Sequence, residues 1–238
     1  MLEAACNKLS YENFDKIYAI IRGAIEDAVS EPGTGGLVGT VERTKRDVVV
    51  AIVKRACSSG SYIDLYVRAL KRLQRDGMGV AVLSAVSRMA AEFRDDGLLV
   101  HTISEDAEYD AFCSHLLDKR TRLGLLKVLV RACEPGDVAA LADAVLKDFA
   151  AAVADPGYAV DLVFDGVAVV HELCPDMRAA ASSAVRRARD AGGLSNRSKF
   201  QAMDLLEDAS PSSRDKCVRR TTALSRVAET TRARAGRQ

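Results

Sequence analysis

Aromatic side chains are scarce in this chain of 238 residues: it has no tryptophan, and the aromatic fraction is only 5%. Proteins that read single-stranded RNA by base stacking need several aromatic side chains on one surface. We therefore expect no stacking platform. The formal net charge is only +1, so the molecule is not a polycation, and any nucleic-acid binding must come from a local basic patch.

Long apolar runs and secretion signals are also missing. No stretch approaches the roughly 18 consecutive apolar residues of a membrane-spanning helix, and the residues after Met1 do not resemble a signal peptide. We therefore expect no membrane. Without such a signal and without a Cys-x-x-Cys pair, we expect reduced, mostly buried thiols in a cytosolic or nuclear compartment, and we predict a cytoplasmic location. The six cysteines are Cys6, Cys57, Cys113, Cys133, Cys174 and Cys217.

The sequence motifs of common catalytic sites are absent as well. There is no Gly-x-x-x-x-Gly-Lys-Ser/Thr phosphate loop and no Gly-x-Ser-x-Gly nucleophile motif. The three histidines do not come with a second pair of residues at zinc-ligand spacing. We therefore expect a protein that is not an enzyme and that holds no cofactor or metal.

Helical periodicity dominates what the sequence does contain. The hydrophobic fraction of 48% and the charged fraction of 28% are those of a globular protein. Apolar residues recur at helical spacing in successive segments separated by short breaks. These predicted helices are 14–28, 41–56, 61–73, 78–93, 105–116, 119–133, 135–149, 158–173, 177–190 and 200–206, with a loop at 95–104 and a last helix from about 212 to 230. The pattern predicts an all-α fold, and the helix lengths fit antiparallel pairs stacked as a solenoid.

Helix starts can be predicted from capping residues. Ser10, Ser61 and Asp137 each stand before an apolar periodic run, where a side-chain oxygen can accept from a free backbone N–H. Near the C-terminus Gly193 ends one helix and Ser195 caps the next. In the predicted helix 200–206, three apolar residues share one face and are expected in the core: Phe200, Met203 and Leu206.

Three segments resemble the middle domain of eukaryotic translation initiation factor 4G. Its closing signature, Leu-Ser-Ser-Arg-x-Arg-Phe-x-x-x-Asp followed by two hydrophobic residues, is similar to residues 194–206. Its opening Leu-Asn-Lys-Leu-Thr-Pro-x-x-Phe is similar to residues 7–14, with Tyr11 in place of proline. Its Lys-Ala-x-x-Glu-Pro-x-Phe turn is similar to residues 55–62, with Ser59 and Gly60 in place of Glu-Pro. Residues 119–127 match more weakly.

The resemblance implies a fold and a function for residues 1–208. The fold would be a HEAT-like right-handed solenoid of about five antiparallel helix pairs. The function would be a translation initiation scaffold that binds and activates a DEAD-box RNA helicase of the initiation factor 4A class. Residues that would contact its two RecA-like lobes are Arg55, Ser58, Ser59 and Tyr62 at one end, and Asn196, Arg197 and Lys199 at the other. Such a short, divergent version would suit a virus-encoded or protist factor.

Arginine clusters give a second, electrostatic expectation. Arg186, Arg187 and Arg189 precede Arg197 and Lys199, and residues 209–238 are expected to form a basic C-terminal helix and tail, partly disordered. Weak RNA contacts are predicted for Arg186, Arg187, Arg219, Arg220 and Arg226. A solvated helix face is the plainer explanation of the cluster.

Other functions stay open from the sequence. The same helical domain occurs in scaffolds of mRNA splicing, mRNA decay and ribosome biogenesis, and a generic HEAT-like adaptor would also fit. No tyrosine starts the Tyr-x-x-x-x-Leu-hydrophobic motif that usually recruits a cap-binding protein. If such a partner binds, it does so by another route.

Overall fold

The computed structural model describes residues 2–30, 38–103 and 108–208, and in these residues the fold is all-α. The only β pairing among them is an isolated bridge between His101 and Tyr158. The helices are α1 (Leu2–Asn7), α2 (Phe14–Ser30), α3 (Val38–Ser58), α4 (Ile63–Leu73), α5 (Gly79–Asp96), α6 (Tyr109–Ala132), α7 (Pro135–Ala154), α8 (Val160–Leu173), α9 (Arg178–Asp190) and α10 (Asn196–Asp208).

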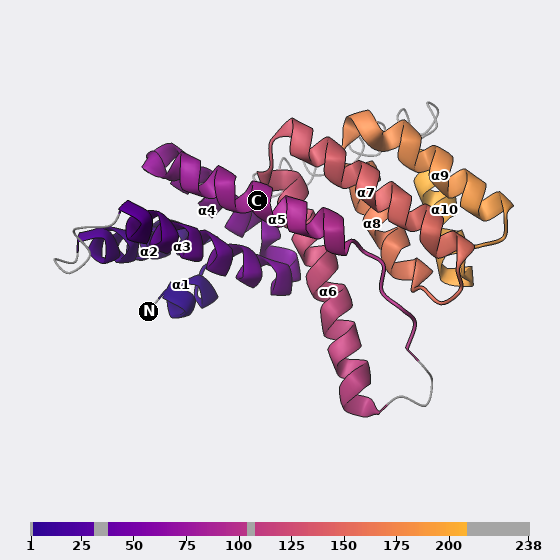
Figure 1. Cartoon of the computed structure of the whole chain (residues 1–238), viewed down its shortest axis with the longest axis horizontal. Coiled ribbons are helices and arrows are strands. Elements are labelled where there is room, and N and C mark those ends of the chain that lie inside the picture. Colours follow the sequence, from indigo (N-terminus) through magenta and orange to yellow (C-terminus); the bar gives the residue numbers. More distant parts are fainter. Residues whose placement is uncertain (1, 31–37, 104–107, 209–238) are drawn as a thin grey trace, which may run out of the picture.

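Each helix from α1 to α10 packs against the next one in the chain, and α3, α6 and α8 hold the array together. The helix α3 contacts α1, α2, α4, α5 and α6, whereas α8 contacts α6, α7, α9 and α10. Figure 1 shows α1–α4 at one end of the molecule and α7–α10 at the other. One hydrophobic core runs through both ends, from Phe14 of α2 to Leu205 of α10.

The helices α3 and α6 cross in direct backbone contact because α6 has a glycine at the crossing. A Cβ atom on Gly124 would lie only 2.3 Å from the carbonyl oxygen of Cys57. Real Cβ atoms do not approach so closely, so any larger residue would push the two helices apart. Burial at this crossing raises the pKa of the Cys57 thiol to about 12.

The segment after α5 is anchored to α7 by a carboxylate. Gly97 ends α5 with a φ of 60°, and the next backbone N–H, of Leu98, donates to Asp148 Oδ2 at 2.7 Å. The Leu98 side chain is fully buried and packs where a Cβ on Gly166 would lie. Burial raises the pKa of Asp148, and the bond from Leu98 opposes this shift.

Polar contacts join α2 to α4 and to the turn Gln74–Met78 that follows α4. The Tyr18 hydroxyl donates to Asp76 at 2.8 Å, while Arg72 pairs with Asp15 and lies 4.3 Å from the centre of the Tyr18 ring. Burial and then Asp76 raise the pKa of Tyr18 above its usual range. Phe14, the last residue of the opening segment, is buried beneath Arg68.

Several sequence-based expectations about helix ends are wrong. The predicted helices 105–116 and 119–133 are one continuous helix from Tyr109, because nothing in the sequence breaks it and Asp118 pairs with Arg122 along it at 3.0 Å. Asp137 does not cap α7, which starts at Pro135; its carboxylate accepts instead from the Ser87 hydroxyl on α5 at 2.6 Å. The Asp137 carboxylate therefore binds a side chain on another helix and not the backbone N–H groups at the start of its own helix.

The two other predicted caps near the N-terminus are also wrong. Ser61 lies in a 3-10 turn, Gly60–Tyr62, and α4 begins without a side-chain cap. Ser10 does not stand directly before a helix, because α2 starts at Phe14. Its backbone N–H donates to Asn13 Oδ1 at 2.7 Å. Residues 31–36, between the predicted helices 14–28 and 41–56, and the predicted C-terminal helix and tail lie outside the described residues.

Candidate partner interfaces

The last turn of α3 and the residues between α3 and α4 contain four of the predicted helicase-binding residues, and two of these bind neighbouring backbone. The hydroxyls of Ser58 and Ser59 both donate to the carbonyl oxygen of Arg55, at 3.0 and 2.7 Å. The Arg120 guanidinium of α6 donates to the Ser58 carbonyl at 3.0 Å. The two serine hydroxyls therefore bind one carbonyl in the last turn of α3, and the Ser58 carbonyl is bound by Arg120.

The two other residues of this turn are available to a partner. The side chains of Arg55 and Tyr62 are exposed, and the Tyr62 ring lies 6.3 Å from the ring of Tyr11, which is also exposed. Tyr11 replaces the proline of the opening signature, so the first and third matched segments meet here. The two rings present exposed aromatic surface, and aromatic side chains and arginine are both enriched in protein interfaces.

A groove of about 490 Å³ runs beside the turn, between α1 and α3. Its lining mixes acidic, basic and apolar side chains: Asn7, Asp47, Val50, Ala51, Lys54, Arg55 and Ser58. Arg55 belongs to both the turn and the groove. We call Arg55, Tyr62 and this groove the α3 site. The groove was not foreseen, because it depends on how α1 lies against α3.

The closing segment, 194–206, is held by a carboxylate from α8. Ser195 caps α10, as predicted: its Oγ accepts from the backbone N–H of Ser198 at 3.1 Å. The hydroxyls of Ser195 and Ser198 both donate to Asp161 Oδ1 at 2.6 Å. These bonds fix how α10 is rotated about its own axis.

That rotation contradicts the predicted core face of α10. Phe200 is 72% exposed and Met203 is 51% exposed, and Leu206 is only half-buried. The buried positions are instead Ser198, Ala202 and Leu205. These residues also have helical spacing, but two of them are small, so a search for large apolar residues selects the wrong face.

The predicted helicase-binding residues of α10 lie on or beside its outer face. Asn196 and Lys199 are exposed next to Phe200 and Met203. We call these four residues the α10 face. Arg197 lies apart from it and pairs with Asp165 of α8 at 3.5 Å. Burial raises the pKa of Asp165, and the charge of Arg197 lowers it.

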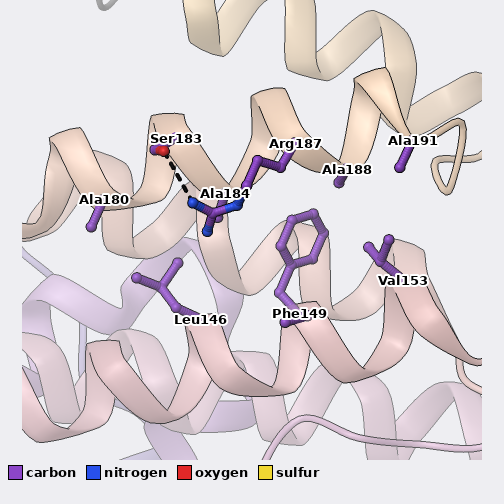
Figure 2. Close-up of a pocket in the computed structure, with 10 residues that line it drawn as sticks. Leu146, Phe149, Val153, Ala180, Ser183, Ala184, Arg187, Ala188 and Ala191 are labelled. Atoms are coloured by element: carbon purple, nitrogen blue, oxygen red, sulfur yellow. Dashed lines mark hydrogen bonds between the residues drawn. The ribbon is translucent and has the colours of Figure 1, made fainter.

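Two of the three arginines in the predicted cluster on α9 bind neighbouring side chains of the same helix. Arg186 is exposed, whereas Arg189 pairs with the adjacent Asp190 at 3.0 Å. Arg187 donates to Ser183 at 3.3 Å, and Figure 2 shows its guanidinium lying across the space between α7 and α9. Arg219, Arg220 and Arg226 fall outside the described residues.

The space that Arg187 crosses is an apolar groove of about 370 Å³. Figure 2 shows small alanines of α9 facing larger side chains of α7, Leu146, Phe149 and Val153. The groove exists because the alanines of α9 leave space there. Its only charged lining residue is Arg187.

The α3 site and the α10 face are far apart in the fold. The first lies where α3 packs on α6, while α10 packs on α8 and α9 at the other end of the molecule. Among the residues the structure covers, no three histidine, cysteine or acidic side chains gather as metal ligands would. Within the same residues, no helix has the length and apolar character needed to cross a bilayer.

No protein-family model matches the chain, and no curated protein matches it either.

Proposed function

We propose that this chain is a helical scaffold that binds a DEAD-box RNA helicase of the initiation factor 4A class and stimulates its ATPase. The observation that carries the proposal is the exposure of Phe200 and Met203 beside Asn196 and Lys199. Large apolar side chains next to polar ones on a surface are typical of protein-binding sites. This face lies in the segment whose sequence resembles the closing signature of factor 4G middle domains.

The proposed architecture is a HEAT-like right-handed solenoid of about five helix pairs. Its support is the packing of every helix against its neighbour in the chain, from α1 to α10. An array of this kind offers two long outer surfaces, so its function is binding. Two widely separated contact sites also suit a partner made of two lobes.

The mechanism we propose is a shift in the population of helicase conformations. The α3 site would bind one RecA-like lobe and the α10 face the other. A scaffold that binds both lobes best when they face each other favours the ATPase-competent arrangement, by no more than its differential affinity for that arrangement. All the chemistry stays in the helicase.

RNA contact would be secondary and electrostatic. The helix α9 contains four arginines and one aspartate, so its net charge is positive, and Arg186 is exposed. Such a patch adds affinity through release of counterions from phosphates and reads no sequence. A cytoplasmic location, and recruitment of a cap-binding protein by a non-standard route, belong to the same proposal.

The test is to capture a 4A-class helicase on the immobilised chain and to measure its RNA-dependent ATPase. We expect Arg55→Glu with Tyr62→Ala to weaken capture, and Lys199→Glu with Phe200→Ala to do the same. Either pair should abolish ATPase stimulation, because stimulation needs both lobes. Arg88→Glu with Val80→Ala, which changes exposed residues of α5 in the same way, should alter neither.

Helicases from different processes separate the alternatives. Capture of a splicing, decay or ribosome-biogenesis helicase in preference to a 4A-class one would reassign the scaffold to that process. Absence of capture and of stimulation for all of them would refute helicase binding and leave a helical adaptor with another partner.

A further inference from the structure

The N-terminal half of α6 forms an arm that extends away from the rest of the molecule. Figure 1 shows it projecting beyond the region where the C-terminal half of α6 meets α3 and α8. From Tyr109 to Asp118 every side chain is exposed except that of His115, which is half-buried. A helix of about three turns is marginally stable in water by itself, so a partner that covered the arm would stabilise it.

One side of this arm is apolar. Tyr109 is 78% exposed and Leu117 is 61% exposed, and Phe112, Cys113 and Leu116 are also exposed. Because each residue advances a helix by about 100°, these five side chains form a continuous stripe along the arm. We call it the arm stripe. Contiguous exposed apolar surface of this kind marks an interaction site.

The charges beside the stripe indicate what covers it. Glu108 is the N-cap residue of α6, and Lys119 lies at the base of the arm. Eleven residues are close to three full helical turns, so both lie on the same flank of the stripe. When two identical helices pack antiparallel about a two-fold axis, equal flanks meet and opposite ends lie together. The Glu108 end of one arm then lies beside the Lys119 end of the other.

We propose that the chain forms a symmetric homodimer through antiparallel packing of two arm stripes. Glu108 of each copy faces Lys119 of the other, which gives two equivalent ion pairs in one closed interface. This register places the two-fold axis between residues 113 and 114. The exposed Cys113 thiols of the two copies therefore lie side by side. The dimer would leave the α10 face, which lies on α10 at the other end of the molecule, to other partners.

Sedimentation velocity on the full chain tests the proposal without any helicase, so its failure is separate from failure of helicase binding. The two helices bury less surface than a standard interface, so association is expected to be weak and is sought up to about 500 μM. Leu116→Lys should weaken dimerisation at least about tenfold, since it buries a charge in the stripe. Val80→Lys, on exposed α5 surface, is the control and should leave dimerisation unchanged.

Charge reversal tests the antiparallel register. Glu108→Lys and Lys119→Glu should each weaken dimerisation about threefold to tenfold, because each creates two like-charge contacts. The double variant restores opposite charges across the two copies and should recover wild-type dimerisation. A second copy in a different register would not show this rescue, so loss of rescue would overturn the assignment.

Thiol cross-linking supplies an independent readout. In a Cys217→Ser background, a short bismaleimide should link two chains through Cys113, and Cys113→Ser should abolish the link. Cys6, Cys57 and Cys174 are buried and Cys133 is half-buried, so they do not compete well. A chain that stays monomeric throughout, or a dimer that neither responds to Leu116→Lys nor cross-links through Cys113, would refute the proposal.

Discussion

Ser198 and Asp161, 37 residues apart in the sequence, are joined by a hydrogen bond of 2.6 Å that orients the last described helix. The Ser198 side chain is completely buried, and Asp161 accepts from Ser195 through the same oxygen. A buried hydroxyl needs its partner, because leaving it unpaired costs free energy. This one carboxylate therefore decides that Ser198 points inward and that Phe200 points outward.

We expect Asp161→Ala to lower the free energy of unfolding by about 1–3 kcal/mol, since two hydroxyls lose their acceptor. Urea denaturation at neutral pH measures the change. Asp190→Ala, at the exposed end of α9, is the matched control and should stay within about 0.5 kcal/mol. In the Ser198→Ala background the cost of Asp161→Ala should fall, because the two changes share one interaction. Additive costs would show that the bond does not stabilise the fold.

Phe200→Ala should change the free energy of unfolding by no more than about 0.5 kcal/mol, because its side chain is largely in water. Phe149→Ala should cost about 3–5 kcal/mol, since that ring is buried in the core against Phe164. Both values come from urea denaturation of the single variants. A large loss for Phe200→Ala would mean that its ring is covered in solution.

Asp165→Asn should stabilise the fold at neutral pH and less so as the pH falls. Burial raises the pKa of Asp165 in the folded state above its unfolded value of about 4. The folded state then binds the proton more tightly, so the cost of the buried charge is present at neutral pH and is relieved as the pH drops through the folded pKa. Urea denaturation of both proteins at pH 7 and at about pH 4.5 measures the difference.

Arg197→Gln gives the complementary change. Removing the guanidinium takes away the neighbouring charge that lowers the pKa of Asp165, so that pKa should rise further. Titration of the Asp165 carboxyl by NMR would show the rise. An unchanged titration curve would mean that the pair at 3.5 Å is not formed in solution.

RNA affinity should depend steeply on salt if the α9 arginines contact phosphates. Changing Arg186 and Arg187 to Gln removes two contacts and should reduce the slope of log affinity against log salt by up to about 1.4 for a single strand. Changing Arg88 and Arg94 of α5 to Gln removes the same charge from exposed positions on another helix. Equal effects of the two pairs, measured by fluorescence anisotropy, would refute a site on α9.

Periodicity was sufficient to predict most helices and the buried side of α2, where Phe14, Ile21 and Ile25 are buried, but not the buried side of every helix. The helices α2, α5, α8 and α9 lie where apolar spacing predicted them. The single helix α6 was predicted as two, and the buried side of α10 was predicted wrongly. Large apolar residues dominate such a prediction, whereas Ala202 and Ser198 give no signal although they are buried.

The sequence by itself determined the all-α class and the cap at Ser195, because these depend on residues a few positions apart. It placed the end of α9 one residue too late, because the glycine that ends this helix with a φ of 76° is Gly192 and not the predicted Gly193. Only the tertiary structure decided which surfaces remain free. The outward Phe200, the groove beside Arg55 and the projecting arm of α6 all follow from contacts between distant segments. Such contacts depend on which buried polar groups form hydrogen bonds with distant residues, and the spacing of apolar residues along the chain does not predict those partners.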